Sequence, residues 1–100
     1  MLDKIILDLG DNYKIGDNKV LENIIDDVTN EALLISNRTN DDKNKKVLEY
    51  EITETVKRVY LQRGSEDVSS RSESGINSSY HDTIEKLRND IIKNGKRILK

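Results

Sequence analysis

The chain has 100 residues, of which 34% are hydrophobic and 36% charged, and its formal net charge is −2 at pH 7. A single domain of this size buries only about 60–65% of the surface that its unfolded chain exposes, so we expect a thin core and added stability from subunit contacts. The absence of cysteine excludes disulfides, thiolate zinc sites and cysteine catalysis. A chain without a surplus of basic residues is also atypical of a dedicated nucleic-acid binder.

The N-terminal apolar run, Ile5–Leu9, is too short and too acidic in its surroundings for a signal peptide. No other stretch is long enough and apolar enough to cross a membrane. We therefore expect a protein of a cytoplasm-like compartment that has no membrane partner.

In chain order, the first predicted element is a short helix over Leu2–Leu9, which a glycine-containing turn ends. Residues 16–18 then offer cap chemistry for a long helix over Lys19–Ser36. One broad stripe of this helix is apolar at the helical period: Val20, Leu21, Ile24, Ile25, Val28, Ala32 and Ile35. Leu33 and Leu34 lie off that stripe, which predicts partial exposure of both side chains.

A second helix is predicted over Val47–Arg63, after a polar and charged connection at residues 37–46. Its inward residues are apolar or aromatic at helical spacing: Leu48, Ile52, Val56, Val59 and Tyr60. Tyr50 and Leu61 point to a different side of this helix. Gly64 is interpreted as the residue that ends the helix, in the left-handed conformation that glycine adopts readily.

The segment 64–79 is rich in serine and glycine and is predicted to be a long, flexible loop before the last helix. Ser79, followed three residues later by an aspartate, has the pattern of a capping box, so a third helix is expected from Tyr80. Its inward face is apolar or aromatic: Tyr80, Ile84, Leu87 and Ile91. The Asn-Gly pair at 94–95 weakens this helix, and a basic, amphipathic tail follows at 96–100.

These patterns predict one all-α domain, a small bundle of three main helices plus a short N-terminal helix. The expected parts are an N-terminal helix and turn, two amphipathic helices, the long loop, and a C-terminal helix with its basic tail, at residues 1–17, 18–63, 64–79 and 80–100.

No residue pattern indicates catalysis. His81 stands next to Asp82, but adjacent residues on a helix point about 100° apart and no nucleophile motif accompanies the pair. The aspartates of the first half do not fall into the register of a calcium loop. The Gly-Ser segment lacks the lysine and the glycine spacing of a phosphate loop. We therefore expect no enzyme activity, no cofactor and no metal site.

A helix-turn-helix DNA reader is an alternative for a small helical protein. Its two helices would be joined by a turn of about three or four residues, whereas the connections here are longer and the second helix mixes glutamates with Lys57 and Arg58. The basic tail has two open interpretations. It is either a helix end whose cations complement the helix dipole or a docking segment for an acidic groove on a partner.

A series of short motifs follows the second helix in a fixed order: Tyr60-Leu61-Gln62-Arg63-Gly64, Ser69-Ser70, Ser74-Gly75 and Ser78-Ser79-Tyr80. With the helices around it, over Val20–Leu99, this order resembles the head–tail connector proteins of long-tailed bacteriophages, also called adaptor, head-completion or DNA-packaging proteins. In that family a helix ends in a tyrosine followed by an Arg-Gly pair. A serine- and glycine-rich loop then leads to the tyrosine that opens the last helix.

The resemblance implies a structural virion protein, not an enzyme. Such adaptors assemble as a ring, typically of twelve subunits, under the portal vertex of the capsid. The ring extends the DNA channel and offers a docking platform for the head-completion or stopper protein and the tail. A near-neutral charge suits a DNA conduit, because a strongly basic lining would hold the phosphate backbone of the passing duplex.

The implied partners are the portal protein, the stopper protein, other copies of the chain, and double-stranded DNA that passes without sequence-specific binding. The implied location is the head–tail interface of the virion, after synthesis in the cytoplasm of the host bacterium. Two other classes stay open as alternatives, a small helical DNA-binding regulator and a non-viral protein–protein adaptor domain.

Three sets of residues are candidates for contacts within this interpretation. Off-stripe residues of the helices are candidates for subunit contacts: Leu33, Tyr50, Leu61 and Arg63. Residues of the loop are candidates for further subunit or partner contacts: Ser69, Ser70, Arg71 and Ser74. Cations and apolar anchors near the C-terminus are candidates for portal docking: Lys93, Lys96, Arg97, Ile98, Leu99 and Lys100.

Overall fold

The structure, a computed structural model, describes the backbone of residues 1–69 and 73–98 and the side chains of residues 1–62 and 80–98. In this part of the chain the elements are α1 (Leu2–Leu9), the 3-10 turn η1 (Gly10–Asn12), α2 (Asn18–Ser36), α3 (Asp42–Val47), α4 (Glu49–Ser69) and α5 (Glu73–Lys93). The predicted all-α domain with a short N-terminal helix and three main helices is therefore confirmed.

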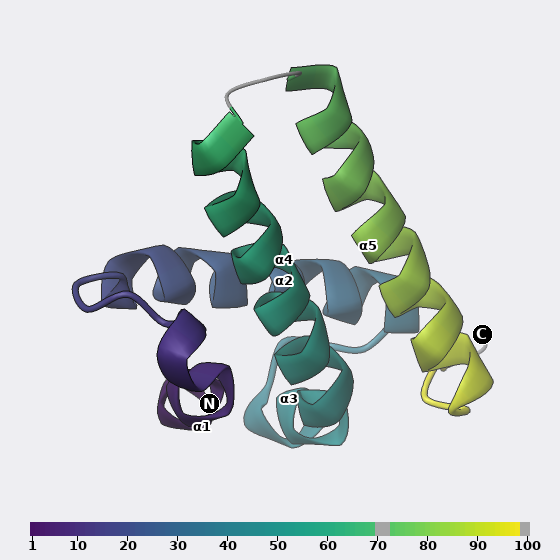
Figure 1. The fold of residues 1–100 in the computed structure, drawn as a ribbon. Coiled ribbons are helices and arrows are strands. Elements are labelled where there is room, and N and C mark those ends of the chain that lie inside the picture. The colour runs from purple at the N-terminus through teal and green to yellow at the C-terminus, as the bar shows by residue number, and fades with distance from the viewer. Residues whose placement is uncertain (70–72, 99–100) are drawn as a thin grey trace.

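Helix α2 is the central element of the packing. Helices α4 and α5 lie side by side and both cross α2, while α1 contacts α2 and α4 (Figure 1). The short α3 contacts α2 and α4 at the other end of the domain. Among the described helices, none is both long enough and apolar enough to span a bilayer.

The core is aliphatic and follows the predicted stripes closely. The predicted inward residues of α2 from Leu21 to Ile35 are buried except for Ile25, which is partly buried against the core. All five predicted inward residues at 48–60 are buried. Helix α5 adds Leu87 and Ile91, against which Tyr80 and Ile84 are partly buried. Because these positions recur at the helical period, burial on one face accounts for why these segments are helices.

Leu33 departs from the prediction, because it is buried at 6% exposure while the adjacent Leu34 is 75% exposed. Other helices pack on α2 from several directions, namely α1, α3, α4 and α5. Its buried arc is therefore wider than the single stripe that the sequence suggests. Val20, in the first turn of α2, was also predicted to face inward but is exposed.

The connection at 37–46 also differs from the prediction, because it contains α3. Asp41 is the N-cap residue, and its carboxylate accepts a hydrogen bond of 2.8 Å from the backbone N–H of Asn44. That bond, together with one from the Thr39 hydroxyl, holds the pKa of Asp41 below its usual value. The residue order Thr-Asn-Asp before a charged run is a helix-start signal that the sequence carried. Val47 consequently ends α3 rather than beginning the second long helix.

Helices α4 and α5 both extend into the serine- and glycine-rich segment, so the predicted bounds of the loop, 64–79, are wrong. Helix α4 continues through Gly64 to Ser69, and α5 already begins at Glu73, so Ser79 is not a helix cap. A glycine inside a helix costs only about 1 kcal/mol relative to alanine, and no proline interrupts the segment. Residues 70–72 lie outside the described residues.

Two helices end near glycines with positive φ, the first as predicted and the second at the Asn-Gly pair that was expected only to weaken it. Gly10 follows α1, and Gly95 follows α5 with a φ of 73°. Beyond α5, the N–H of Gly95 donates to Ile92 and the N–H of Lys96 donates to Ile91, which together form a Schellman turn. This turn directs the chain back toward α2.

The two adjacent leucines of α2 provide a matched test of the packing. Leu33→Ala should lower the free energy of unfolding by about 2–5 kcal/mol, because it leaves a cavity in the core. Leu34→Ala should change it by no more than about 0.5 kcal/mol, because that side chain is largely in water. Urea denaturation followed by circular dichroism measures both, and equal losses would contradict the burial of Leu33.

Candidate interaction surfaces

No cluster of metal-ligating side chains occurs among the described residues, and His81 is exposed at the side of α5. The distinctive features of the described side chains are three surface regions: the outer face of α4, the C-terminal segment at 94–98, and the loop at 13–17.

The outer face of α4 carries two exposed apolar side chains. Tyr50 is 67% exposed and Leu61 is 45% exposed. They are eleven positions apart in the sequence, so they lie about 20° apart around the helix and about 16 Å apart along it. Between them, the Nζ atom of Lys57 lies 2.8 Å from a carboxylate oxygen of Glu54 and 3.4 Å from one of Asp8 on α1. The ionic cluster therefore occupies the middle of this face and ties α1 to α4.

The same cluster shifts two pKa values. Partial burial raises the pKa of Asp8, but the ammonium groups of Lys57 and Lys4 outweigh burial and hold it below the usual value. The hydrogen bond to Glu54 raises the pKa of Lys57. A shallow groove of about 280 Å³ runs along this contact, and Leu61 and Arg58 form part of its wall.

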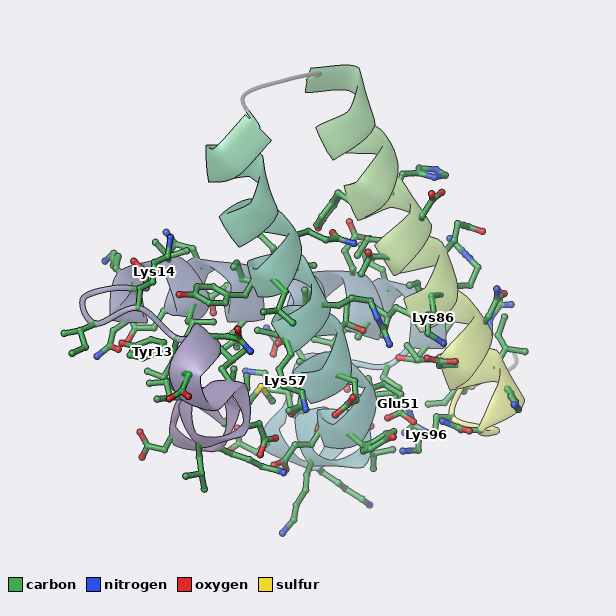
Figure 2. All side chains as sticks on the ribbon, in the orientation of Figure 1. Tyr13, Lys14, Glu51, Lys57, Lys86 and Lys96 are labelled. Carbon is green, nitrogen blue, oxygen red and sulfur yellow. The ribbon has the colours of Figure 1, made fainter. Side chains whose placement is uncertain are left out.

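The C-terminal segment is fixed to α4 by a buried carboxylate. Glu51 is only 2% exposed, and its two oxygens accept hydrogen bonds from the Asn94 carboxamide at 2.6 Å and the Lys96 ammonium at 2.9 Å. Figure 2 shows the Glu51 and Lys96 side chains meeting beside the end of α5. A buried carboxylate is tolerated only when it is paired and hydrogen-bonded, and these two partners satisfy that need.

The same segment is also bonded to the end of α2. The Ile98 N–H donates to the Ser36 carbonyl at 2.8 Å, and the Asn37 side chain donates to the Ile98 carbonyl at 3.0 Å. The Arg38 guanidinium donates to the Lys96 carbonyl at 2.8 Å. Residues up to Ile98 are therefore folded onto the domain.

The predicted portal-docking residues fall into three groups. Lys96 and the backbone of Ile98 are engaged within the domain, whereas Lys93 and Arg97 are exposed. Leu99 and Lys100 lie outside the described residues.

The predicted subunit-contact residues are also dispersed. Leu33 is a core residue, which corrects its assignment as an exposed contact, while Tyr50 and Leu61 share the outer face of α4. The side chains of Arg63, Ser69 and Ser74 are not described, although their backbone belongs to α4 or α5. Ser70 and Arg71 lie outside the described residues.

Sequence reasoning missed the loop at 13–17, which a tyrosine of α4 holds in place. The Tyr60 hydroxyl donates to the Asp17 carboxylate at 2.6 Å and accepts from the Lys14 N–H at 3.1 Å. The ring of Tyr13 stacks on that of Tyr60, with centroids 6.5 Å apart, and its hydroxyl donates to the Asn18 side chain. Figure 2 shows Tyr13 and Lys14 in the loop that precedes α2. The carboxylate of Asp17, predicted as cap chemistry for α2, makes no cap hydrogen bond and is used by Tyr60.

Removing the cation that faces Glu51 should destabilise the domain. Lys96→Met leaves a buried carboxylate with one neutral partner, so we expect a loss of about 2–3 kcal/mol in the free energy of unfolding, below the 3–5 kcal/mol of fully buried pairs. Lys93→Met, on the exposed side of α5, is the control and should be nearly neutral. Adding Glu51→Gln to Lys96→Met should recover part of the loss; strict additivity of the two changes would contradict the pairing.

Removing the hydroxyl that fixes the loop should loosen it. Tyr60→Phe leaves Asp17 and the Lys14 N–H without that partner, so we expect a loss of about 1–3 kcal/mol and faster exchange of the Lys14 amide proton. Tyr50→Phe, at an exposed tyrosine, is the matched control. Unchanged Lys14 exchange in Tyr60→Phe would contradict the role of the hydroxyl.

Tyr60→Phe should also change how the free energy of unfolding depends on pH. Burial, and then the hydrogen bond to Asp17, raise the pKa of Tyr60 above the usual value of 10.0. The folded state therefore holds this proton more tightly than the unfolded state. The resulting stability is full below pH 10 and is lost as the pH rises through the folded pKa, a loss that Tyr60→Phe should lack.

The described surface thus presents an apolar and ionic face on α4, a fixed C-terminal segment and a fixed loop before α2. No protein-family model, no curated protein and no solved structure matches the chain.

Proposed function

We propose that the chain is a structural subunit of a bacteriophage head–tail connector, which assembles as a ring on the portal and offers a platform to the stopper protein. The proposal rests on the order of motifs from Tyr60 to Tyr80 and on one observation in the fold. That observation is the distribution of large apolar side chains that remain in water.

These side chains come from separate elements: Leu7 on α1, Ile15 in the loop, Leu34 on α2, and Tyr50 and Leu61 on α4. Single exposed apolar residues are ordinary on a protein surface. Here they occur on several faces of one small domain, and exposed apolar side chains are the usual material of protein–protein contacts. A ring subunit needs contacts with two neighbours and with partners above and below the ring. Exposed apolar side chains on several faces support that kind of assembly better than a single binding site.

The C-terminal segment supports a portal contact of a particular kind. The segment is fixed by its side-chain bonds to Glu51 and by backbone bonds to the end of α2. Lys93, at the end of α5, and Arg97, within the segment, remain exposed. A surface ordered before binding loses less conformational entropy than a free tail when it docks. We therefore assign portal docking to this ordered cationic surface.

The proposal predicts that the chain binds portal rings encoded by the same genome. Lys93→Glu combined with Arg97→Glu should abolish capture by immobilised portal while leaving helicity and thermal unfolding unchanged, because neither side chain is buried. Lys43→Glu combined with Lys46→Glu reverses two exposed cations of α3 and is the matched control, with capture expected to persist.

Two results would count against the proposal at different levels. Capture that survives the Lys93 and Arg97 changes would reject the docking surface alone. If the wild-type chain does not bind portal and instead retards DNA fragments in a gel-shift assay, the connector function is rejected and a DNA-binding regulator is favoured.

A further inference from the structure

The loop before α2 presents an isoleucine to solvent. Ile15 is 99% exposed, although it is flanked by Lys14 and Asp17, which the Tyr60 hydroxyl holds on both sides of it. A fixed backbone cannot turn this side chain back toward the core. The loop therefore holds a branched apolar side chain in water in a set orientation, as an anchor residue in a protein interface would be held.

A groove that is partly apolar, like Ile15, lies at the C-terminal end of α2. It has a volume of about 330 Å³, with Leu33 and Leu34 as its apolar part and Asn30, Arg38 and Asn40 around them. Leu33 is buried and Leu34 is 75% exposed, so the groove is apolar at its base and open on one side. Its shape and lining suit a branched aliphatic side chain with polar neighbours.

Helix α2 separates the two features. It begins directly after the loop and contains both groove leucines in its last turns, and its 19 residues span about 28 Å. Figure 1 shows the loop at one end of α2 and the turn toward α3 at the other. Ile15 therefore cannot reach the groove of its own chain, but it can reach the groove of a second copy.

We propose that Ile15 of one subunit seats in the groove formed by Leu33 and Leu34 of the next subunit. The charges around the two features agree with this pairing, since Lys19 is exposed beside the loop and Asp41 and Asp42 are exposed beyond the groove. The one cation in the groove wall, Arg38, already donates to the Asn44 side chain and the Lys96 carbonyl. A contact between two different patches is heterologous, so each subunit uses its loop on one neighbour and its groove on the other. Repeated around a closed circle, it generates a ring; in that respect the inference rests on the proposed function.

A mixing experiment tests this arrangement. Ile15→Asp destroys the loop anchor but keeps the groove, and Leu34→Asp destroys the groove but keeps the anchor. Each variant alone should lose self-association in light scattering, while an equimolar mixture should form dimers and nothing larger. Leu7→Asp, at another exposed leucine, should associate like the wild type.

Cysteine trapping extends the test to weak association. The chain has no cysteine of its own, so in a mixture of Ile15→Cys and Leu34→Cys chains a short bis-maleimide can join only the introduced thiols. Each variant incubated alone gives the yield of links between identical chains, which is subtracted. The yield of linked dimer should exceed that of a Leu7→Cys and Leu34→Cys mixture several-fold. Equal yields would overturn the contact, as would a mixture of the aspartate variants that stays monomeric while the wild type associates.

The outcomes separate this inference from the proposed function. Chains that bind portal but show no preferential linking would reject the contact and leave the connector function standing. Chains that cross-link as expected but do not bind portal would support the contact between subunits and reject the connector function. Loss of portal binding by Ile15→Asp with self-association unchanged would assign the anchor to the portal and reject the contact.

Discussion

An aliphatic core without phenylalanine or tryptophan is the constraint on which the arrangement of this domain depends. Leucine, isoleucine and valine side chains from α2, α4 and α5 supply most of the burial, with Tyr60 as the one largely buried ring in the described part of the chain. Such packing is non-directional, so it brings helices together without fixing where loops and chain ends lie. Those positions require directional contacts.

Two residues of α4 supply these contacts from inside the domain. Glu51 engages residues 43 and 45 positions away, and Tyr60 engages residues 43 and 46 positions away, so each connects parts of the chain that helix formation alone leaves independent. Both polar groups are largely buried, where a missing partner costs far more than at the surface. The C-terminal segment and the loop before α2 are consequently held by a few directional contacts rather than by large apolar areas.

The helical period of the apolar residues was sufficient to predict α2, the inward face of α4 and the apolar core positions of α5, because burial on one face imposes that period. The Asn-Gly pair at 94–95 was expected only to weaken α5, whereas the helix ends just before it, at Lys93. Leu33 was misjudged because a sequence shows one stripe and not how many neighbours pack on a helix. Gly64 was misjudged because a weak local preference cannot decide whether a helix ends. The contacts of Glu51 and Tyr60 could not be predicted, since nothing local distinguishes Glu51 from Glu49 or Glu54.

The continuity of α2 constrains how this chain can vary. The helix contains neither glycine nor proline, so it cannot easily bend or shorten between its two ends. Substitutions on its exposed face leave the ends where they are. An inserted or deleted residue, by contrast, rotates one end against the other by about 100° and shifts it by about 1.5 Å. Among related sequences, α2 should therefore vary in composition on its exposed face while keeping its length, because the length sets the distance and the rotation between its two ends.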